Sequence, residues 1–149
     1  MNINKIFKSE SFLNQCRKFK LKITPQRIVI YKAVSRSHHH PDSTEIYKIV
    51  KKEFPSITFD TVHRTLLTFS EFNLIAAVEG SDNSKRFDPN IVNHHHLICE
   101  ECGTIIDFQR EEFDKLKVPD TMLHDFHVTR KRVIIAGICK ACQKKNKSK

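Results

Sequence analysis

The sequence predicts an α+β fold with two parts: an N-terminal winged helix-turn-helix domain and a C-terminal α/β domain that carries four cysteines. In the first part, apolar residues recur with a helical period and then give way to a short β-hairpin pattern. Beyond Pro89 and Asn90 the pattern becomes that of strands, and two Cys-x-x-Cys pairs follow. The expected organisation is a domain over 1–87, a hinge over 88–93, a second domain over 94–142 and a tail over 143–149.

The first two helices are predicted from one apolar stripe and one strong start signal. Residues 9–19 place their apolar side chains on a single helical face, and Cys16 on that face is expected to be a small buried residue. Thr24 followed by Pro25 predicts an N-cap and the first residue of a helix that reaches about Ser35.

Two further helices and a β-hairpin complete the first part. Asp42 or Ser43 is expected to start the third helix, and Phe54-Pro55 ends it. Thr58 or Asp60 is expected to start the fourth helix, and Asn73 ends it. Residues 74–79 and 86–87 predict two strands around the turn residues 80–84. Short helices followed by a hairpin are the layout of a winged helix-turn-helix.

The second part predicts strands more than helices. Strands are expected over 94–99, 104–108 and 133–138, with one short helix over 111–117 that Pro119 ends. Residues 143–149 are polar and basic, and we expect them to be disordered.

The charge of the chain is strongly positive and uneven. The net charge is +9, and residues 1–87 hold 15 lysines and arginines against 8 acidic residues. This balance favours a polyanionic partner, although a solvated basic surface would also fit the charge alone. The longest apolar run near the C-terminus, 133–139, is too short to span a bilayer. We therefore expect no membrane partner and a cytoplasmic, reducing location.

Four cysteines with the spacing C-x2-C-x36-C-x2-C predict a structural zinc site. Two short knuckles supply four soft ligands, and four ligands satisfy a zinc ion. Gly103 after the first pair allows the tight turn that a knuckle needs. Metal binding offsets the entropy cost of closing the long loop between the two cysteine pairs. The alternative interpretation of the cysteines is a redox dithiol. The expected zinc ligands are Cys99, Cys102, Cys139 and Cys142.

Histidines just before the first knuckle predict a second metal site. On a strand, His94 and His96 share one face and His95 lies on the other. Asp107, on the next predicted strand, is expected beside the first two. Further candidate ligands are His40 and Asp88. Such a mixed nitrogen and oxygen set suits Fe(II), Mn(II), Co(II) or Zn(II), and exposed polar loops are the alternative interpretation.

The fourth predicted helix begins with side chains suited to nucleic acid. In a helix-turn-helix the second helix enters the major groove by its N-terminal residues. Arg64 suits a guanine or a phosphate, and Asp60 suits either a cytosine amino group or the helix cap. Candidate DNA contacts in this helix and the hairpin are Thr61, His63, Arg64, Lys85 and Arg86, with Thr58 and Asp60 beside them.

An ordered series of motifs between about residues 10 and 142 resembles the ferric uptake regulator (Fur) family of bacterial metal-dependent repressors. The motifs are Ile23-Thr24-Pro25-Gln26-Arg27, His40-Pro41 with Ile46-Tyr47, Phe54-Pro55, Thr61-Val62-x-Arg64-x-Leu66, Arg86-Phe87-Asp88, His94-His95-His96-x-x-Cys99-x-x-Cys102-Gly103 and Gly137-x-Cys139-x-x-Cys142. The series as a whole is far more specific than any one motif.

The resemblance implies a winged-helix DNA-binding domain, a hinge and an α/β dimerisation domain. It implies a homodimer on a palindromic double-stranded operator, and structural zinc at the four cysteines. It also implies a regulatory metal, Fe(II) or Mn(II), with Zn(II) or Co(II) as substitutes in vitro. The positions that match the family's regulatory ligands are His40, Asp88, His94, His96 and Asp107.

Asp107 favours the peroxide-responsive PerR branch, because iron-responsive members usually carry Glu at this position. In that branch Fe(II) reacts with hydrogen peroxide and oxidises a ligand histidine, and the matching positions are His40 and His94. The alternatives are an iron- or zinc-uptake repressor of the same family and, from other classes, a metalloenzyme or a metal-storage protein. Since no general-base motif accompanies the histidines, we predict that the chain is not an enzyme.

Two departures from the family pattern concern the operator and a third metal site. The fourth helix has Asp60-Thr61-Val62-His63 where relatives usually have Ala-Thr-Val-Tyr, which predicts a changed operator sequence. The positions of the third metal site of some members are about His95, Asp114 and Lys131, and a lysine is a poor metal ligand.

Overall fold

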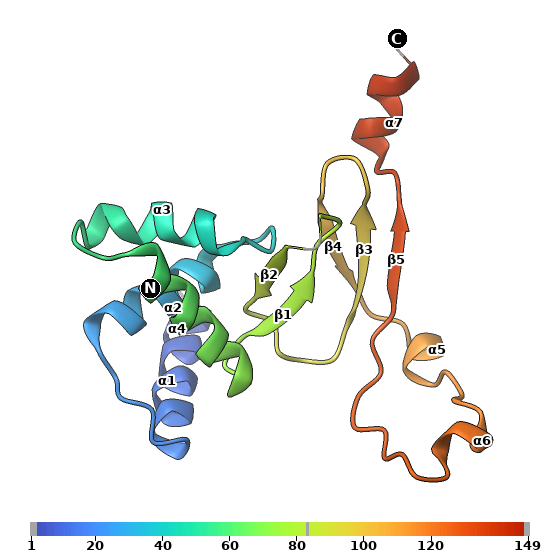
Figure 1. Ribbon diagram of the computed structural model, residues 1–149, viewed down its shortest axis with the longest axis horizontal. Helices are drawn as coiled ribbons and strands as arrows, with labels where there is room; N and C mark the ends of the chain where they lie inside the picture. The colour runs from blue at the N-terminus through green and yellow to red at the C-terminus, as the bar shows by residue number, and fades with distance from the viewer. Residues whose placement is uncertain (1–2, 83, 148–149) are drawn as a thin grey trace. The chain divides into compact units, whose positions relative to one another are not determined.

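The computed structural model describes residues 3–82 and 84–147 and divides into two compact units (Figure 1). Of the described residues, the N-terminal unit holds 3–79 and 84–91, and the C-terminal unit holds 80–82 and 92–147. In the described ranges, no helix combines the length and the apolar character of a membrane span.

The N-terminal unit is a winged helix. Its elements are α1 (Ile3–Lys18), α2 (Pro25–Arg36), α3 (Ser43–Glu53), α4 (Phe59–Glu71), β1 (Ala76–Glu79) and β2 (Lys85–Asp88). The two strands pair in antiparallel register and form the wing. The predicted winged helix-turn-helix is therefore confirmed, although α1 begins well before the expected residue 9.

Side-chain caps define where three of these helices begin. Thr24 Oγ1 accepts the Arg27 N–H at 3.3 Å, as the sequence predicts. Of the two candidates for α3, Asp42 is the cap, and it forms a reciprocal capping box with Glu45. Thr58, rather than Asp60, caps α4. Asn73, with φ of 53°, follows the end of α4 in the left-handed conformation that stops a helix.

The core of the N-terminal unit joins all four helices to the wing. Phe12 of α1 stacks on Tyr31 of α2, with ring centroids 4.0 Å apart, and meets the edge of Phe69 of α4. Phe87 of the wing is fully buried in the same cluster. Cys16 is 1% exposed in this core, which confirms it as a small buried residue.

The C-terminal unit is built on a three-stranded sheet in the order β4-β3-β5. Its elements are β3 (His95–Cys99), β4 (Ile105–Phe108), α5 (Glu111–Asp114), α6 (Asp120–Leu123), β5 (Ile134–Gly137) and α7 (Lys140–Lys147). β4 pairs with β3 antiparallel, and β5 pairs with β3 parallel. This mixed sheet with helices confirms the α/β class predicted for the second part.

Two expectations for the C-terminal unit are wrong. The helix expected over 111–117 is only one turn long, and the single turn α6 follows Pro119. The tail expected to be disordered forms α7 as far as Lys147; residues 148–149 lie outside the described residues. Polarity alone predicted disorder, but alanine, glutamine and lysine are good helix formers, and the Gln143 N–H donates to the Cys139 carbonyl in the first turn.

Candidate metal centres and DNA-binding face

Four cysteines converge at one end of the sheet in the C-terminal unit. Their Sγ atoms all lie within 4.8 Å of one another. The Cys99 and Cys142 sulfurs are 3.9 Å apart, and the Cys102 and Cys139 sulfurs are 3.7 Å apart. A tetrahedral zinc ion with Zn–S bonds of about 2.3 Å holds its sulfurs roughly 3.8 Å apart. The donor set and its spacing therefore fit a zinc ion.

Hydrogen bonds prepare the first knuckle to carry negative charge. The Cys139 N–H donates to Cys99 Sγ at 3.3 Å, and with the Cys102 N–H it lowers the pKa of the Cys99 thiol to about 6. The Thr104 hydroxyl, 3.1 Å from Cys102 Sγ, lowers the pKa of that thiol. Hydrogen bonding with the Cys139 thiol, together with burial, raises the pKa of Cys142. A bound cation would stabilise the fourth thiolate that the protein alone disfavours.

Two histidines and one carboxylate meet on one face of the β3–β4 strand pair. The rings of His94 and His96 lie 4.5 Å apart, edge to face, and both are buried. The β3–β4 register places His96 opposite Asp107, whose Oδ1 lies 3.4 Å from His96 Nε2 and 3.6 Å from His94 Nε2. The Nδ1–H of His94 donates to the Val92 carbonyl at 2.6 Å, which leaves Nε2 as the lone-pair donor.

A second pair of candidate ligands lies within the N-terminal unit. His40 Nε2 is 3.5 Å from Asp88 Oδ2, and both side chains are buried. The Phe87 N–H donates to the Pro41 carbonyl at 2.9 Å, so the loop before α3 is tied to the strand that ends at Asp88. The Asn90 N–H donates to Asp88 Oδ1 at 2.7 Å and orients the carboxylate. Together these bonds hold an imidazole and a carboxylate side by side.

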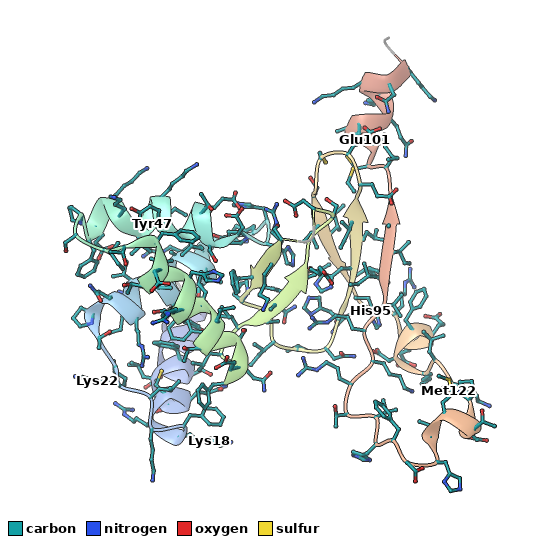
Figure 2. All side chains as sticks on the ribbon, in the orientation of Figure 1. Lys18, Lys22, Tyr47, His95, Glu101 and Met122 are labelled. Atoms are coloured by element: carbon teal, nitrogen blue, oxygen red, sulfur yellow. The ribbon has the colours of Figure 1, made fainter. Side chains whose placement is uncertain are left out.

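His95 is placed differently from its two neighbours, as strand alternation predicts. The Val133 N–H donates to its Nδ1 at 3.2 Å, and its Nε2 lies 3.3 Å from Asp114 Oδ1 (Figure 2). The ring also packs against Phe113. Lys131 donates to the Asp114 backbone carbonyl at 3.4 Å, so its ammonium group lies beside this pair as a cation. The described contacts of His95 hold the start of β5 against β3.

The candidate DNA contacts differ in how free their side chains are. Arg64 is 78% exposed and lies 3.5 Å from Asp60, one turn earlier on the same face of α4. His63 instead lies with its Nδ1 2.8 Å from the Ser43 hydroxyl and its ring stacked on Phe59. Thr61 is half-buried, and its hydroxyl forms a hydrogen bond with the hydroxyl of Thr58, the N-cap of α4.

The two wing residues also differ. Lys85 is exposed, whereas Arg86 is half-buried and lies 3.5 Å from Glu45 of α3. Glu45 and Ser43 are partners of candidate DNA contacts that the sequence alone did not predict. The spacing of Asp42 and Glu45, which is that of a capping box, is the signal that would have placed Glu45 near the start of α3.

A winged helix joined to a sheet with four clustered cysteines defines a class of two-part regulators. The sequence model of the ferric uptake regulator family matches residues 18–136. The chain therefore belongs to this family of metal-dependent regulators. The peroxide-responsive repressor PerR of Staphylococcus aureus (strain Mu50 / ATCC 700699) is 38% identical over 136 residues, which cover 91% of this chain and 92% of that protein. The family prediction, including its similarity to the peroxide-responsive branch, is confirmed.

Two solved structures show the same fold with sequence similarity. The ferric uptake regulator Fur of Helicobacter pylori, described with three functional metal binding sites, has a TM-score of 0.76 and 25% identity, covering 91% of this chain and 93% of that chain. The peroxide stress regulator of Campylobacter jejuni has a TM-score of 0.64 and 27% identity, covering 95% of this chain and 100% of that chain.

Proposed function

We propose that this chain is a homodimeric, metal-dependent transcriptional repressor that binds a palindromic operator and senses peroxide. The observation that carries the proposal is the meeting of two buried imidazoles with one carboxylate: Asp107 Oδ1 lies 3.6 Å from Nε2 of His94 and 3.4 Å from Nε2 of His96. The 38% identity to PerR of Staphylococcus aureus supports the peroxide branch.

Zinc at the four cysteines has a structural role in this proposal. Cys102 lies in the turn between β3 and β4, and Cys139 and Cys142 lie at the end of β5 and in α7. One ion therefore fastens together all three strands of the sheet and its C-terminal helix. Because four protein ligands complete a tetrahedral zinc site, no coordination position is left for substrate, which agrees with a protein that is not an enzyme.

The regulatory metal draws its ligands from both units. Three ligands come from His94, His96 and Asp107, and two come from the His40–Asp88 pair. Neither group alone offers the five or six ligands that Fe(II) or Mn(II) accepts in a mixed nitrogen and oxygen site. Sharing one ion would fix the orientation of the two units and so the spacing of the two α4 helices in a dimer.

Oxidation of a ligand histidine would release this connection. When bound, Fe(II) would supply the one electron that reduces hydrogen peroxide to hydroxide and a radical able to oxidise a neighbouring imidazole. His40 and His94 are the histidines proposed to be oxidised, and either change removes one nitrogen donor from the set. The apo protein then samples other orientations of its units and binds the operator more weakly.

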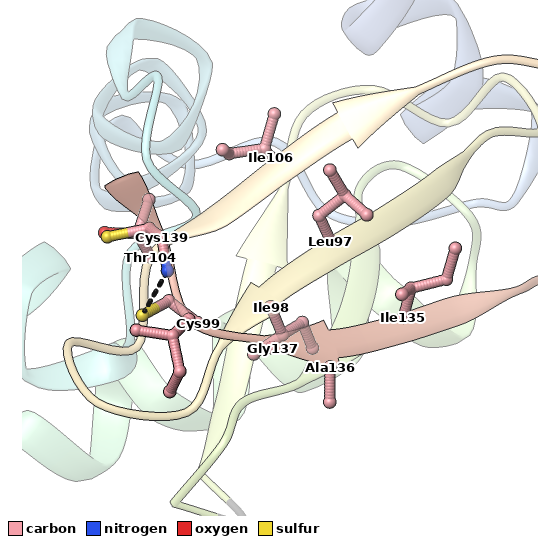
Figure 3. Close-up of a pocket in the computed structure, with 10 residues that line it drawn as sticks. Leu97, Ile98, Cys99, Thr104, Ile106, Ile135, Ala136, Gly137 and Cys139 are labelled. Atoms are coloured by element: carbon pink, nitrogen blue, oxygen red, sulfur yellow. Dashed lines mark hydrogen bonds between the residues drawn. The ribbon is translucent and has the colours of Figure 1, made fainter. Parts of the chain in front are cut away.

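The dimer interface lies on the exposed face of the sheet. One apolar row crosses the sheet in register, formed by Ile106 of β4, Leu97 of β3 and Ile135 of β5 (Figure 3). Each of these side chains is 39–48% exposed. Apolar rows of this kind on one face of a sheet mark protein–protein contact surfaces. His94 and His96 are on the other face, so pairing of two copies leaves the regulatory ligands clear.

The test uses operator DNA selected from a random duplex library with the Mn(II)-loaded protein. Operator affinity is measured for protein loaded with Mn(II), Fe(II), Zn(II) or Co(II), before and after hydrogen peroxide, with mass spectrometry of the His40 and His94 peptides. We expect peroxide to abolish binding only with Fe(II) and to add one oxygen atom to a histidine peptide. If Fe(II)-loaded protein keeps its affinity and mass after peroxide, an iron-uptake repressor replaces this proposal.

A further inference from the structure

The C-terminal helix α7 has two chemically different faces. One face carries Cys142, Gln143 and Asn146, whose side chains all bond within the C-terminal unit. Lysines occupy the other face at positions 140, 144 and 147, the i, i+4, i+7 spacing of a single helical stripe, with Lys145 beside it. All four lysines are exposed.

The inner face anchors α7 at several points. Cys142 Sγ lies 3.9 Å from Cys99 Sγ, so the first turn of the helix is part of the cysteine cluster. The Gln143 side chain donates to the Ile138 carbonyl at 2.6 Å, and the Asn146 side chain donates to Glu101 Oε1 at 2.7 Å. Figure 2 shows Glu101 at the base of α7. The lysines are thus presented by a fixed helix.

Local energetics account for only part of this arrangement. Lysines in the last turn interact favourably with the helix dipole. However, like charges at i and i+4 repel each other, and Lys140 and Lys144 are such a pair. Lys140 also lies at the first residue of the helix, where a cation opposes the dipole. Residues 140–149 contain five lysines and no acidic residue, so the stripe is a concentrated positive charge.

We propose that this lysine stripe is a second DNA-binding surface, which contacts phosphates of duplex DNA outside the bases that α4 reads. The inference rests on the proposed function, because a protein that binds an operator meets duplex DNA, the polyanion that the charge of the stripe complements. Rows of lysine ammonium groups on a fixed helix complement the closely spaced phosphates of a duplex and carry no sequence preference. The stripe would therefore add affinity and salt dependence, and leave operator choice to α4.

The test compares the metal-loaded full-length protein with a variant in which all four lysines become glutamine, K140Q/K144Q/K145Q/K147Q. Affinity is measured by fluorescence anisotropy across a series of salt concentrations, on the selected operator alone and on the operator extended by unrelated flanking sequence. Each phosphate that the variant no longer neutralises should make the slope of log K against log salt less steep by about 0.9. We expect this change with the extended duplex, and an unaltered dependence on the regulatory metal.

Two matched variants separate this proposal from trivial effects of charge. The quadruple lysine-to-arginine variant keeps the charge and should keep the wild-type slope. A second variant replaces four exposed cations elsewhere in the same unit by glutamine, at Arg110, Lys115, Lys117 and Arg130, and should also keep the slope. Circular dichroism and zinc content confirm that each variant is folded.

The outcomes are distinct from a failure of the proposed function. If K140Q/K144Q/K145Q/K147Q keeps the wild-type slope on extended DNA, the stripe is not a DNA-binding surface. The same conclusion follows if both glutamine variants reduce the slope equally. Loss of binding to anionic phospholipid vesicles with an unchanged DNA slope would also overturn the proposal. If wild-type protein shows no metal-dependent operator binding, the proposed function itself fails.

Discussion

Arg64 on α4 is the residue whose replacement tests most directly where DNA binds. Arg64 and Asp60 are 78% and 74% exposed, and Arg64 Nε lies 3.5 Å from Asp60 Oδ2. An ion pair this exposed contributes about 0–1 kcal/mol to stability, so Arg64→Gln should fold like the wild type. A bidentate arginine contact to guanine is worth about 1–3 kcal/mol, which is roughly 5- to 150-fold in affinity. We therefore predict that Arg64→Gln lowers operator affinity by this factor and leaves the stability of the protein unchanged.

The assay is anisotropy on the selected operator, with urea denaturation as the stability control. Asp60→Asn is the matched variant. Because Thr58 is the N-cap of α4, Asp60→Asn keeps the cap. It removes an anion beside Arg64, so its affinity for unrelated duplex DNA should rise. An Arg64→Gln protein with wild-type stability and wild-type operator affinity would refute the placement of the first turns of α4 in the groove.

Four further predictions test the other parts of the proposal. His40→Ala should keep its zinc content but bind operator with the same low affinity with and without added Mn(II), as measured by anisotropy. Cys142→Ser should lose zinc by elemental analysis and lose the helical signal of α7 by circular dichroism, since the cysteine joins that helix to the cluster. Ile135→Asp should sediment as a monomer, because it puts a charge into the apolar row on the sheet. Phe69→Ala should lower the free energy of unfolding in urea by about 3–5 kcal/mol, as Phe69 is fully buried.

Features set by nearby residues could be predicted from the sequence. Thr24 with Pro25 begins α2 and Asn73 follows the end of α4, as expected, while Thr58, one of two candidates, caps α4. Each of these residues acts on backbone groups within a few positions. Alternation along a strand also separates His95 from its two neighbours on the sequence alone. Such signals are local, because a cap or a strand face depends on few residues.

Features that depend on partners far along the chain were missed. The order of α7 depends on Asn146 reaching Glu101, 45 positions earlier, and on the cysteine cluster. The bond between Ser43 and His63 joins two helices and leaves no periodic signal. By contrast, Asp107 lies beside His96 as expected, although the alternation pattern fixes only the face of a strand and the β3–β4 pairing supplies the register.

The same strand connects the two proposed metal sites. β3 begins beside His94 and ends at Cys99, so His96 and Cys99 are three residues, or about 10 Å, apart along one extended chain. Cys102 fixes the turn into β4, and Cys139 fixes the end of β5, so the cysteine cluster determines the register of both strands that pair with β3. The position of Asp107 against His96 follows from that register. We therefore predict that zinc at the cysteines helps to hold Asp107 beside His96, so that removing zinc also weakens binding of the regulatory metal.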